Sequence, residues 1–220
     1  MDLEPQRKAH ILVLAGDFNP AIFQPHWLAS LALIRRGEAE NASIEVIHKD
    51  VSIFSLEWCK INVTAERLVL ETTQEPYFQI ARDLVVSIMR ALAHTPVRAV
   101  GINWDRRYFF QNQEQWNQLG HTLVPKQRWA ALDNPGTLKV MVRGKKNPES
   151  LGYQDVTLES IQTKENPWGV RIFMNDHYSL KNDAELGHSA EQAVEIIETY
   201  WEDSAAQMER VSSNLLRDAS

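Results

Sequence analysis

The stretch TQEPYFQIARDLVVSIMRALAHTP (73–96), followed by VRAVGINWDRRYFF (97–110), decides the fold predicted for this chain. Apolar residues in its first part recur every three or four positions, which is the period of an amphipathic helix. Thr73 is a candidate N-cap and Pro76 suits a first helical turn. Pro96 ends the helix, because the residue before a proline is pushed out of the α region.

The pattern changes directly after this proline. Val100, Ile102 and Trp104 alternate with smaller or polar residues, which predicts a half-buried strand over 97–104. A long helix that leads straight into a strong strand at mid-chain divides the sequence into two comparable parts.

Working outward from this stretch, the same two patterns predict the remaining elements. Strands are expected at 10–16, 43–50, 52–63, 67–71, 137–143, 153–161 and 169–175. Helices are expected at 25–34, within 112–132, and over about 27 residues from a capping box at Ser189. The apolar alternation of 52–63 changes parity near Cys59-Lys60, and a β-bulge there would restore it.

The predicted order is β-α-β-β-β-α, repeated once. This order favours an α+β fold made of two units, 1–96 and 97–220, packed as one compact body. We expect a curved antiparallel sheet that continues through both units, with helices on one face and a long C-terminal helix. In element order the chain resembles the duplicated saddle of the TATA-binding protein and the helix-grip folds. That resemblance implies a fold and no function.

Four blocks carry a second resemblance: GDFNPAIFQPHWL (16–28), TTQEPYFQIARDLV (72–85), VRAVGINWDRRYFF (97–110) and NDHYSL (175–180). They look like the blocks of a sporadically distributed bacterial family of hypothetical proteins, some of them encoded near mobile or defence elements. The resemblance implies a bacterial, cytoplasmic, accessory role. It assigns no activity to any residue.

Composition excludes several classes of protein. With 44% hydrophobic and 24% charged residues, the 220-residue chain can bury a substantial core. Its single cysteine, Cys59, excludes an internal disulfide framework and a multi-cysteine metal site. The first ten residues lack the apolar segment of a signal peptide, and no run is long enough to cross a bilayer, so we expect a cytoplasmic protein.

The net charge of -6 conceals an asymmetry. Residues 98–146 hold nine Lys or Arg against three acids, whereas 183–209 hold eight acids and no Lys or Arg. One interpretation is that the acidic helix covers the basic stretch and the charges compensate. The other is that the basic stretch meets an acidic partner or a polyanion.

The motifs of several familiar enzymes are missing. The sequence has no Walker phosphate loop, dinucleotide glycine fingerprint, zincin motif, nucleophile elbow or C-x-x-C pair. The seven histidines show no ligand spacing, so we expect no metal and no cofactor. His26, His121 and Cys59 are expected to be structural residues.

The best polar cluster is Asn175-Asp176-His177 at the end of a predicted strand. A histidine beside an aspartate can act in acid–base chemistry near neutral pH. Asp17 occupies a comparable loop after the first strand. Asp176, His177 and Asp17 are therefore the candidate catalytic residues, and the alternative is that they form turns that satisfy backbone groups.

Arginines alternate with aromatic residues at 104–110. Such a segment can stack single-stranded bases, but an acidic protein lacks general affinity for phosphates. The alternative is that the rings pack in the core while Arg106 and Arg107 pair with acids, for example on the last helix.

The last helix has an apolar side that is longer than a compact domain needs. It is expected either to cover the sheet or to offer Tyr200, Trp201 and Met208 to a partner.

Three functional hypotheses follow. The first is a non-catalytic binding or assembly subunit that holds a protein partner, or a second copy, through Tyr200, Trp201, Met208, Arg106 and Arg107. The second is a small-molecule-binding protein or enzyme with a pocket near Asp17, Trp104, Asp176 and His177. The third is nucleic-acid binding, which requires the cations of 98–146 to share one face. They are Arg98, Arg106, Arg107, Arg143, Lys145 and Lys146.

Overall fold

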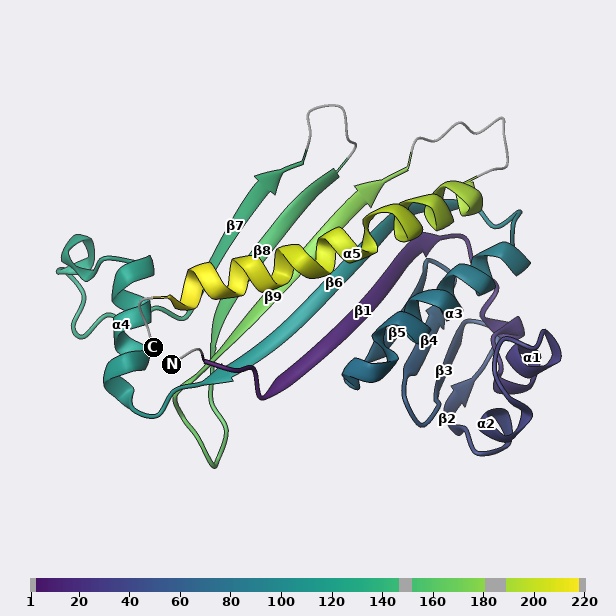
Figure 1. The fold of residues 1–220 in the computed structure, drawn as a ribbon, viewed down its shortest axis with the longest axis horizontal. Helices are drawn as coiled ribbons and strands as arrows, with labels where there is room; N and C mark the ends of the chain where they lie inside the picture. The colour runs from purple at the N-terminus through teal and green to yellow at the C-terminus, as the bar shows by residue number, and fades with distance from the viewer. Residues whose placement is uncertain (1–2, 147–151, 181–188, 218–220) are drawn as a thin grey trace.

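The computed structural model describes residues 3–146, 152–180 and 189–217. Nine strands form one antiparallel sheet in the order β2-β3-β4-β5-β1-β6-β9-β8-β7 (Figure 1). In chain order the strands are β1 (Arg7–Gly16), β2 (Ser43–Ile47), β3 (Val51–Ser55), β4 (Lys60–Thr64), β5 (Arg67–Thr72), β6 (Val97–Phe109), β7 (Lys139–Lys145), β8 (Gly152–Ile161) and β9 (Gly169–Ser179).

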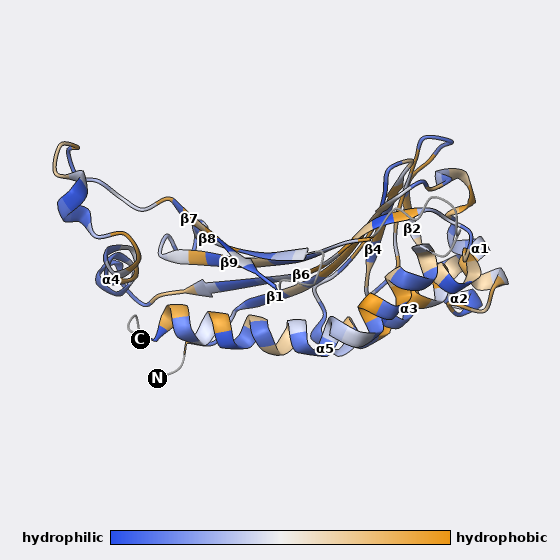
Figure 2. Ribbon diagram, turned by 90° about the horizontal axis from the view of Figure 1, so that it is seen from above, coloured by the Kyte–Doolittle hydropathy of each residue, from blue (hydrophilic) through white to orange (hydrophobic). Residues whose placement is uncertain are grey.

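The α-helices are α1 (Pro25–Ser30), α2 (Arg36–Glu40), α3 (Phe78–Ala91), α4 (Gln113–Leu123) and α5 (Ser189–Leu216). Three short 3-10 helices, at Pro20–Ile22, Glu75–Tyr77 and Lys126–Trp129, complete the described elements. In Figure 2 the helices lie on one side of a curved sheet, and its concave side carries none of the described helices. The predicted α+β fold is confirmed.

The two halves meet at the centre of the sheet. β1 and β6 pair along almost their whole length, from Arg7↔Arg107 to Gly16↔Val97. Outward from this pair, β5, β4 and β3 on one side correspond to β9, β8 and β7 on the other. The first half has one more strand than the predicted order, so β2 extends the sheet beyond this correspondence.

The extra strand comes from residues 52–63, where the expectation of one bulged strand was wrong. The chain turns back between β3 and β4, and the Leu56 amide donates to the Cys59 carbonyl across the turn. Phe54 then lies opposite Ile61, so both apolar sets reach the same face of the sheet. The change of parity therefore marks a hairpin.

The helix starts later than its sequence predicts. Glu75–Tyr77 form a 3-10 turn after Gln74, and α3 follows from Phe78. The Thr73 N-cap expectation was therefore wrong, although Pro76 does lie in the first turn. The buried side of α3 has the predicted apolar period: Phe78, Ala81, Leu84, Val85, Val86, Ile88 and Met89.

The core lies between the helices and one face of the sheet. Its largest fully buried side chains include Phe23, Phe54, Trp104 and Phe110, which come from both halves. α5 packs on β6, β9 and α3. One apolar cluster therefore runs through both halves of the chain.

Candidate functional site

Asn175, Asp176 and His177 lie inside β9, not in a turn at its end. β9 continues to Ser179, because β6 extends far enough to pair with it from Ala99↔Ser179 to Phe109↔Gly169. Successive side chains of a strand point to opposite faces. Asp176 therefore points to the helix-covered side and His177 to the helix-free side, so the sheet separates the acid–base pair suggested by their adjacency.

Asp176 is the centre of a polar cluster under α5. Its side chain is 3% exposed, and Lys146 Nζ lies 2.6 Å from its Oδ1. The Tyr178 hydroxyl donates to Oδ2 at 3.3 Å, and Gln154 Nε2 donates to Oδ1 at 3.4 Å. Burial of a carboxylate requires such partners.

Two tyrosines complete this cluster around the Lys146 ammonium group. Its Nζ lies 3.3 Å from the ring centroid of Tyr178 and 5.7 Å from that of Tyr200. The two rings stack with centroids 5.1 Å apart. Burial lowers the pKa of Lys146, and Asp176 opposes this shift. The contact between Lys146 and Tyr200 joins the end of β7 to α5.

A groove of about 510 Å³ opens over this cluster. Asp203, Gln207 and Arg210 of α5 form its outer wall, and Asp176 and Tyr178 form part of its floor. The two cations and two acids of the lining balance, so the groove suits a small polar or zwitterionic molecule. Burial raises the pKa of Tyr178 well above its ordinary value, so its phenol stays protonated.

On the helix-free face, three planar groups stack across β7, β8 and β9. The Arg143 guanidinium lies 3.9 Å from the Tyr153 ring centroid, and the rings of Tyr153 and His177 stack at 4.5 Å. Asp155 holds Arg143 through two 2.7 Å hydrogen bonds. Burial lowers the pKa of His177, while Asp155 opposes the shift.

The same face carries a second charged cluster. Arg171 Nε lies 2.6 Å from Asp105 Oδ2, and Arg107 Nε lies 3.7 Å from Asp105 Oδ1. Glu159 lies 3.7 Å from Arg171. The arginines of this face are thus largely neutralised by acids of neighbouring strands, which weakens the case for phosphate binding.

The cations proposed for nucleic acid do not share one face. Arg106 and Lys146 are on the helix-covered side, where they pair with Glu209 and Asp176. Arg107 and Arg143 are on the helix-free side. Arg98, near the start of β6, pairs with Asp17. Among described residues, Arg106–Glu209 is the one ion pair that joins the basic stretch 98–146 to the acidic stretch 183–209. Two acids of the acidic stretch, Asp183 and Glu185, lie outside the described residues.

α5 uses its apolar side within the chain. Met208 is fully buried, and Trp201 Nε1 donates to His10 Nε2 at 2.8 Å. Tyr200 remains 42% exposed at the groove over Asp176. α5 is therefore a long cover helix, and of Tyr200, Trp201 and Met208 only Tyr200 is well exposed.

Sequence reasoning missed a buried histidine. His10 is fully buried beneath Trp201 and stacks on Trp104 with ring centroids 4.2 Å apart. Since Nε2 accepts from Trp201, the proton lies on Nδ1, which donates to the Asn103 carbonyl at 3.1 Å. Burial lowers the pKa of His10 to about 3, so this imidazole stays neutral.

The other sequence candidates are dispersed. Asp17 pairs with Arg98 near the start of β6, and Trp104 Nε1 donates to Ser204 beneath α5 at 3.0 Å. Cys59 is buried at the β3–β4 turn, and burial raises the pKa of its thiol to about 12. Among the described residues, no group of three or more His, Cys, Asp or Glu side chains could hold a metal ion.

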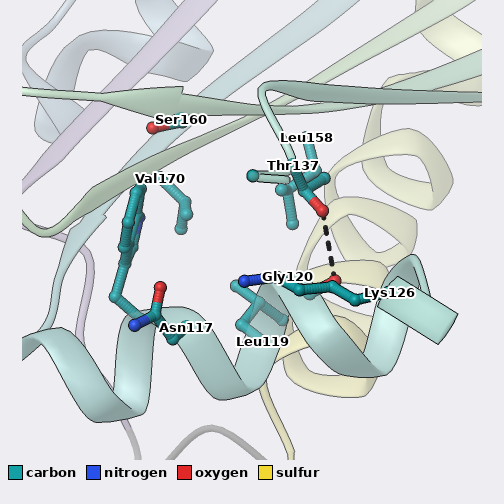
Figure 3. A pocket seen from close by; sticks show the side chains of 10 residues that line it. Asn117, Leu119, Gly120, Lys126, Thr137, Leu158, Ser160 and Val170 are labelled. Atoms are coloured by element: carbon teal, nitrogen blue, oxygen red, sulfur yellow. Dashed lines mark hydrogen bonds between the residues drawn. The ribbon is translucent and has the colours of Figure 1, made fainter. Parts of the chain in front are cut away.

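A small cavity lies between α4 and the ends of β8 and β9 (Figure 3). Its volume of about 40 Å³ holds a few water molecules at most. Leu119, Leu158 and Val170 line it, and Thr137 Oγ1 donates to the Gly120 carbonyl at its mouth (3.2 Å). This cavity is a packing joint between α4 and the sheet and is too small for a metabolite.

The least covered part of the molecule is the segment leading into β7 together with β7 itself. Of the nine exposed large apolar side chains in the described chain, five lie between residues 129 and 142. They are Trp129 (50% exposed), Leu132 (57%), Leu138 (78%), Met141 (56%) and Val142 (61%). We call these five residues the edge patch.

The sequence pattern at Leu138, Val140 and Val142 predicted a half-buried strand. β7 does form, but it is the last strand of the sheet, and α5 lies over β6 and β9 instead. The α5 ribbon passes across β7 in the view of Figure 1, but the main contacts of α5 with the sheet are to β6 and β9. The edge patch therefore keeps its apolar surface in solvent.

Comparison of the sequence with protein-family models and with curated proteins gave no match. Within the described residues, no helix is long and apolar enough to cross a membrane.

Proposed function

We propose that this protein is a non-catalytic binding subunit that holds a protein partner at the β7 edge of its sheet. The edge patch carries the proposal. Large contiguous apolar surfaces on folded proteins mark interaction sites, whereas isolated exposed apolar residues are ordinary. Five such residues lie within 14 positions, on an edge strand and the segment before it. Met141 and Val142 point to opposite faces of β7, so they flank its outer edge from both sides.

The polar clusters support binding better than catalysis. Asp176 and His177 point to opposite faces, and the cations beside them are held by acids at 2.6–2.7 Å. The proposal differs from the sequence hypothesis in its surface, because α5 has its apolar side turned toward the sheet. We further propose that the protein acts in the bacterial cytoplasm, in an accessory role in a defence or mobile-element system. The resemblance of the four sequence blocks supports this part of the proposal.

Site-specific photo-crosslinking tests the proposal. A benzoylphenylalanine placed at Leu138 or at Val142 should give the same discrete adduct in the producing cell. The matched control is Ile80 on α3, which is 48% exposed and lies far from β7. An adduct from both edge positions and none from the control supports the proposal. Absence of an edge adduct, or the same adduct from Ile80, contradicts it.

A second candidate function is small-molecule binding in the groove over Asp176. Its volume of about 510 Å³ and its convergent Gln154, Tyr178 and Tyr200 are the observations that favour it. A thermal-shift screen with amino acids and small zwitterions tests it. A compound that binds the groove should raise the melting temperature of the parent chain and of Ile80→Ala. It should not raise that of Tyr200→Ala, which lacks one wall of the groove.

A further inference from the structure

We infer that the partner binds as an extended strand alongside β7, with side chains that alternate between acidic and apolar. The inference rests on the proposed function and names the chemistry of the partner at the same site. The inference is supported by the backbone of β7, by the direction of its side chains, and by two lysines that have no ion pair with a described residue.

β7 has one free edge. β8 pairs with its inner side from Lys139↔Glu159 to Lys145↔Tyr153, and no described strand pairs with its outer side. Its seven residues extend over roughly 23 Å. An unpaired row of N–H and C=O groups of this length is a template for an added strand.

The two faces of β7 differ in chemistry. Lys139, Met141, Arg143 and Lys145 share the helix-free face, because their β8 partners include Glu159 and Asp155. Three of these four are cations, and we call the three the cationic row. Val140 and Val142 point to the opposite face, next to Leu158 and Val156. A strand added on the outer side continues this pattern, with its own residues opposite a cationic row and an apolar row.

The cationic row is only partly satisfied within the chain. Arg143 is held by Asp155 through two hydrogen bonds. Lys139 and Lys145 are exposed, and neither has an ion pair with a described residue. Two acidic side chains, spaced to lie opposite these lysines, would complete the row. The helix-side valines require apolar residues between the acids.

A second copy of the chain fits this edge poorly. Antiparallel self-pairing centred on Met141 places Lys139 of each copy opposite Arg143 of the other. Centring on Val142 places Lys139 opposite Lys145. Like charges directly opposite each other destabilise a strand pair. Lysines on an edge strand also oppose aggregation, which is consistent with an edge reserved for an acidic strand.

Labelled synthetic peptides provide the first probe, measured by fluorescence anisotropy on the full chain. A peptide of alternating glutamate and valine should bind about tenfold more tightly than one of alternating lysine and valine. N-methylation of its alternate backbone amides should abolish binding, because the hydrogen bonds to β7 are lost. Equal binding of the two charge patterns would overturn the inference.

Charge reversal on the protein provides the second probe. Lys139→Glu with Lys145→Glu should reverse the peptide preference and leave the Arg143–Asp155 pair intact. Lys49→Glu, an exposed site in the β2–β3 turn, is the matched control and should leave the preference unchanged. Circular dichroism establishes that each variant is folded, and the two single variants should each show part of the effect.

The crosslinking yield separates this inference from the proposed function. If the Val142 adduct persists at full yield in the Lys139→Glu, Lys145→Glu chain, the partner is confirmed and its acidic-strand chemistry is refuted. If the parent chain gives no adduct, the proposed function itself fails. A concentration-dependent dimer that Leu138→Glu converts to a monomer would assign the edge to a second copy and overturn the inference.

Discussion

At the scale of single residues, the chain buries His10 and Asp176 under α5 and gives both of them hydrogen-bond partners. His10 is held between Trp201 and the Asn103 carbonyl, and Asp176 is held by Lys146 and Tyr178. Such networks fix the position of a cover helix, because a shift of α5 would leave buried donors and acceptors unpaired. Both networks make predictions about stability.

The neutral state of His10 predicts a loss of stability in acid. The folded chain keeps this imidazole neutral down to a pKa of about 3, whereas the unfolded chain takes up a proton below about pH 6.5. The unfolded state then binds more protons, so the free energy of unfolding falls as the pH decreases from 6.5 toward 3. The expected slope from this residue is about 1.4 kcal/mol per pH unit.

Urea unfolding between pH 6.5 and 5 measures this slope. His10→Gln retains a donor and an acceptor but does not titrate, so its stability should fall less steeply with acid. His177 is present in both chains and cancels in the comparison. Parallel slopes in the two proteins would show that His10 is not buried and neutral.

Lys146 predicts a position-specific loss of stability. Lys146→Met leaves the buried Asp176 without its cation and should lower the free energy of unfolding by about 1–3 kcal/mol. Lys145→Met changes the neighbouring exposed lysine and should stay within about 0.5 kcal/mol of the parent. Adding Asp176→Asn to Lys146→Met should recover part of the loss. Equal effects at 145 and 146 would refute the cluster.

At the scale of elements, two glycines distinguish a close approach from an ordinary helix position. A Cβ on Gly16 would lie 2.4 Å from the Pro96 carbonyl, at the end of the central β1–β6 pair. One on Gly37, in α2, would meet nothing within 4 Å.

Gly16→Ala should therefore destabilise the chain by about 1–3 kcal/mol, because the strands must separate locally. Gly37→Ala should stabilise it by about 0.5–1 kcal/mol through helix propensity. Thermal unfolding of both variants checks the pair. A tolerated Gly16→Ala would mean that β1 and β6 are not in this register.

Much of the architecture could be predicted from the sequence, because α3 and β6 have clear periods of 3.6 and 2. The β3–β4 hairpin could not, since its turn at Glu57 and Trp58 contains none of the usual turn residues. The polar Asn175, Asp176 and His177 resembled the end of a strand. In the structure they lie within β9, because β6 pairs with this part of the strand. This pairing joins residues far apart in the sequence, so the local pattern could not predict it.

The edge patch could not be predicted for a related reason. Leu138, Val140 and Val142 have the pattern of a strand with one covered face, and the pattern does not tell which helix covers it. α5 lies along β6 and β9 because His10 and Trp104 are hydrogen-bonded to its Trp201 and Ser204, and Tyr178 stacks on its Tyr200. β7 is therefore left outside the part of the sheet that α5 covers.

At the scale of the whole molecule, one continuous sheet has two different surfaces for contact. Its concave face carries ion pairs and stacked rings. Its β7 edge carries apolar side chains, a backbone that no described strand pairs on the outer side, and two lysines without an ion pair to a described residue. We propose that the partner binds at this edge rather than on α5 or on the concave face.

Amide hydrogen exchange tests this proposal most directly. It is measured on the full chain alone and on its complex with the partner that crosslinking identifies. We predict that amides within 139–145 exchange quickly in the free protein and become protected on binding, while those of α5 are unchanged. Protection confined to α5, or to β6 and β9 without β7, would contradict the account.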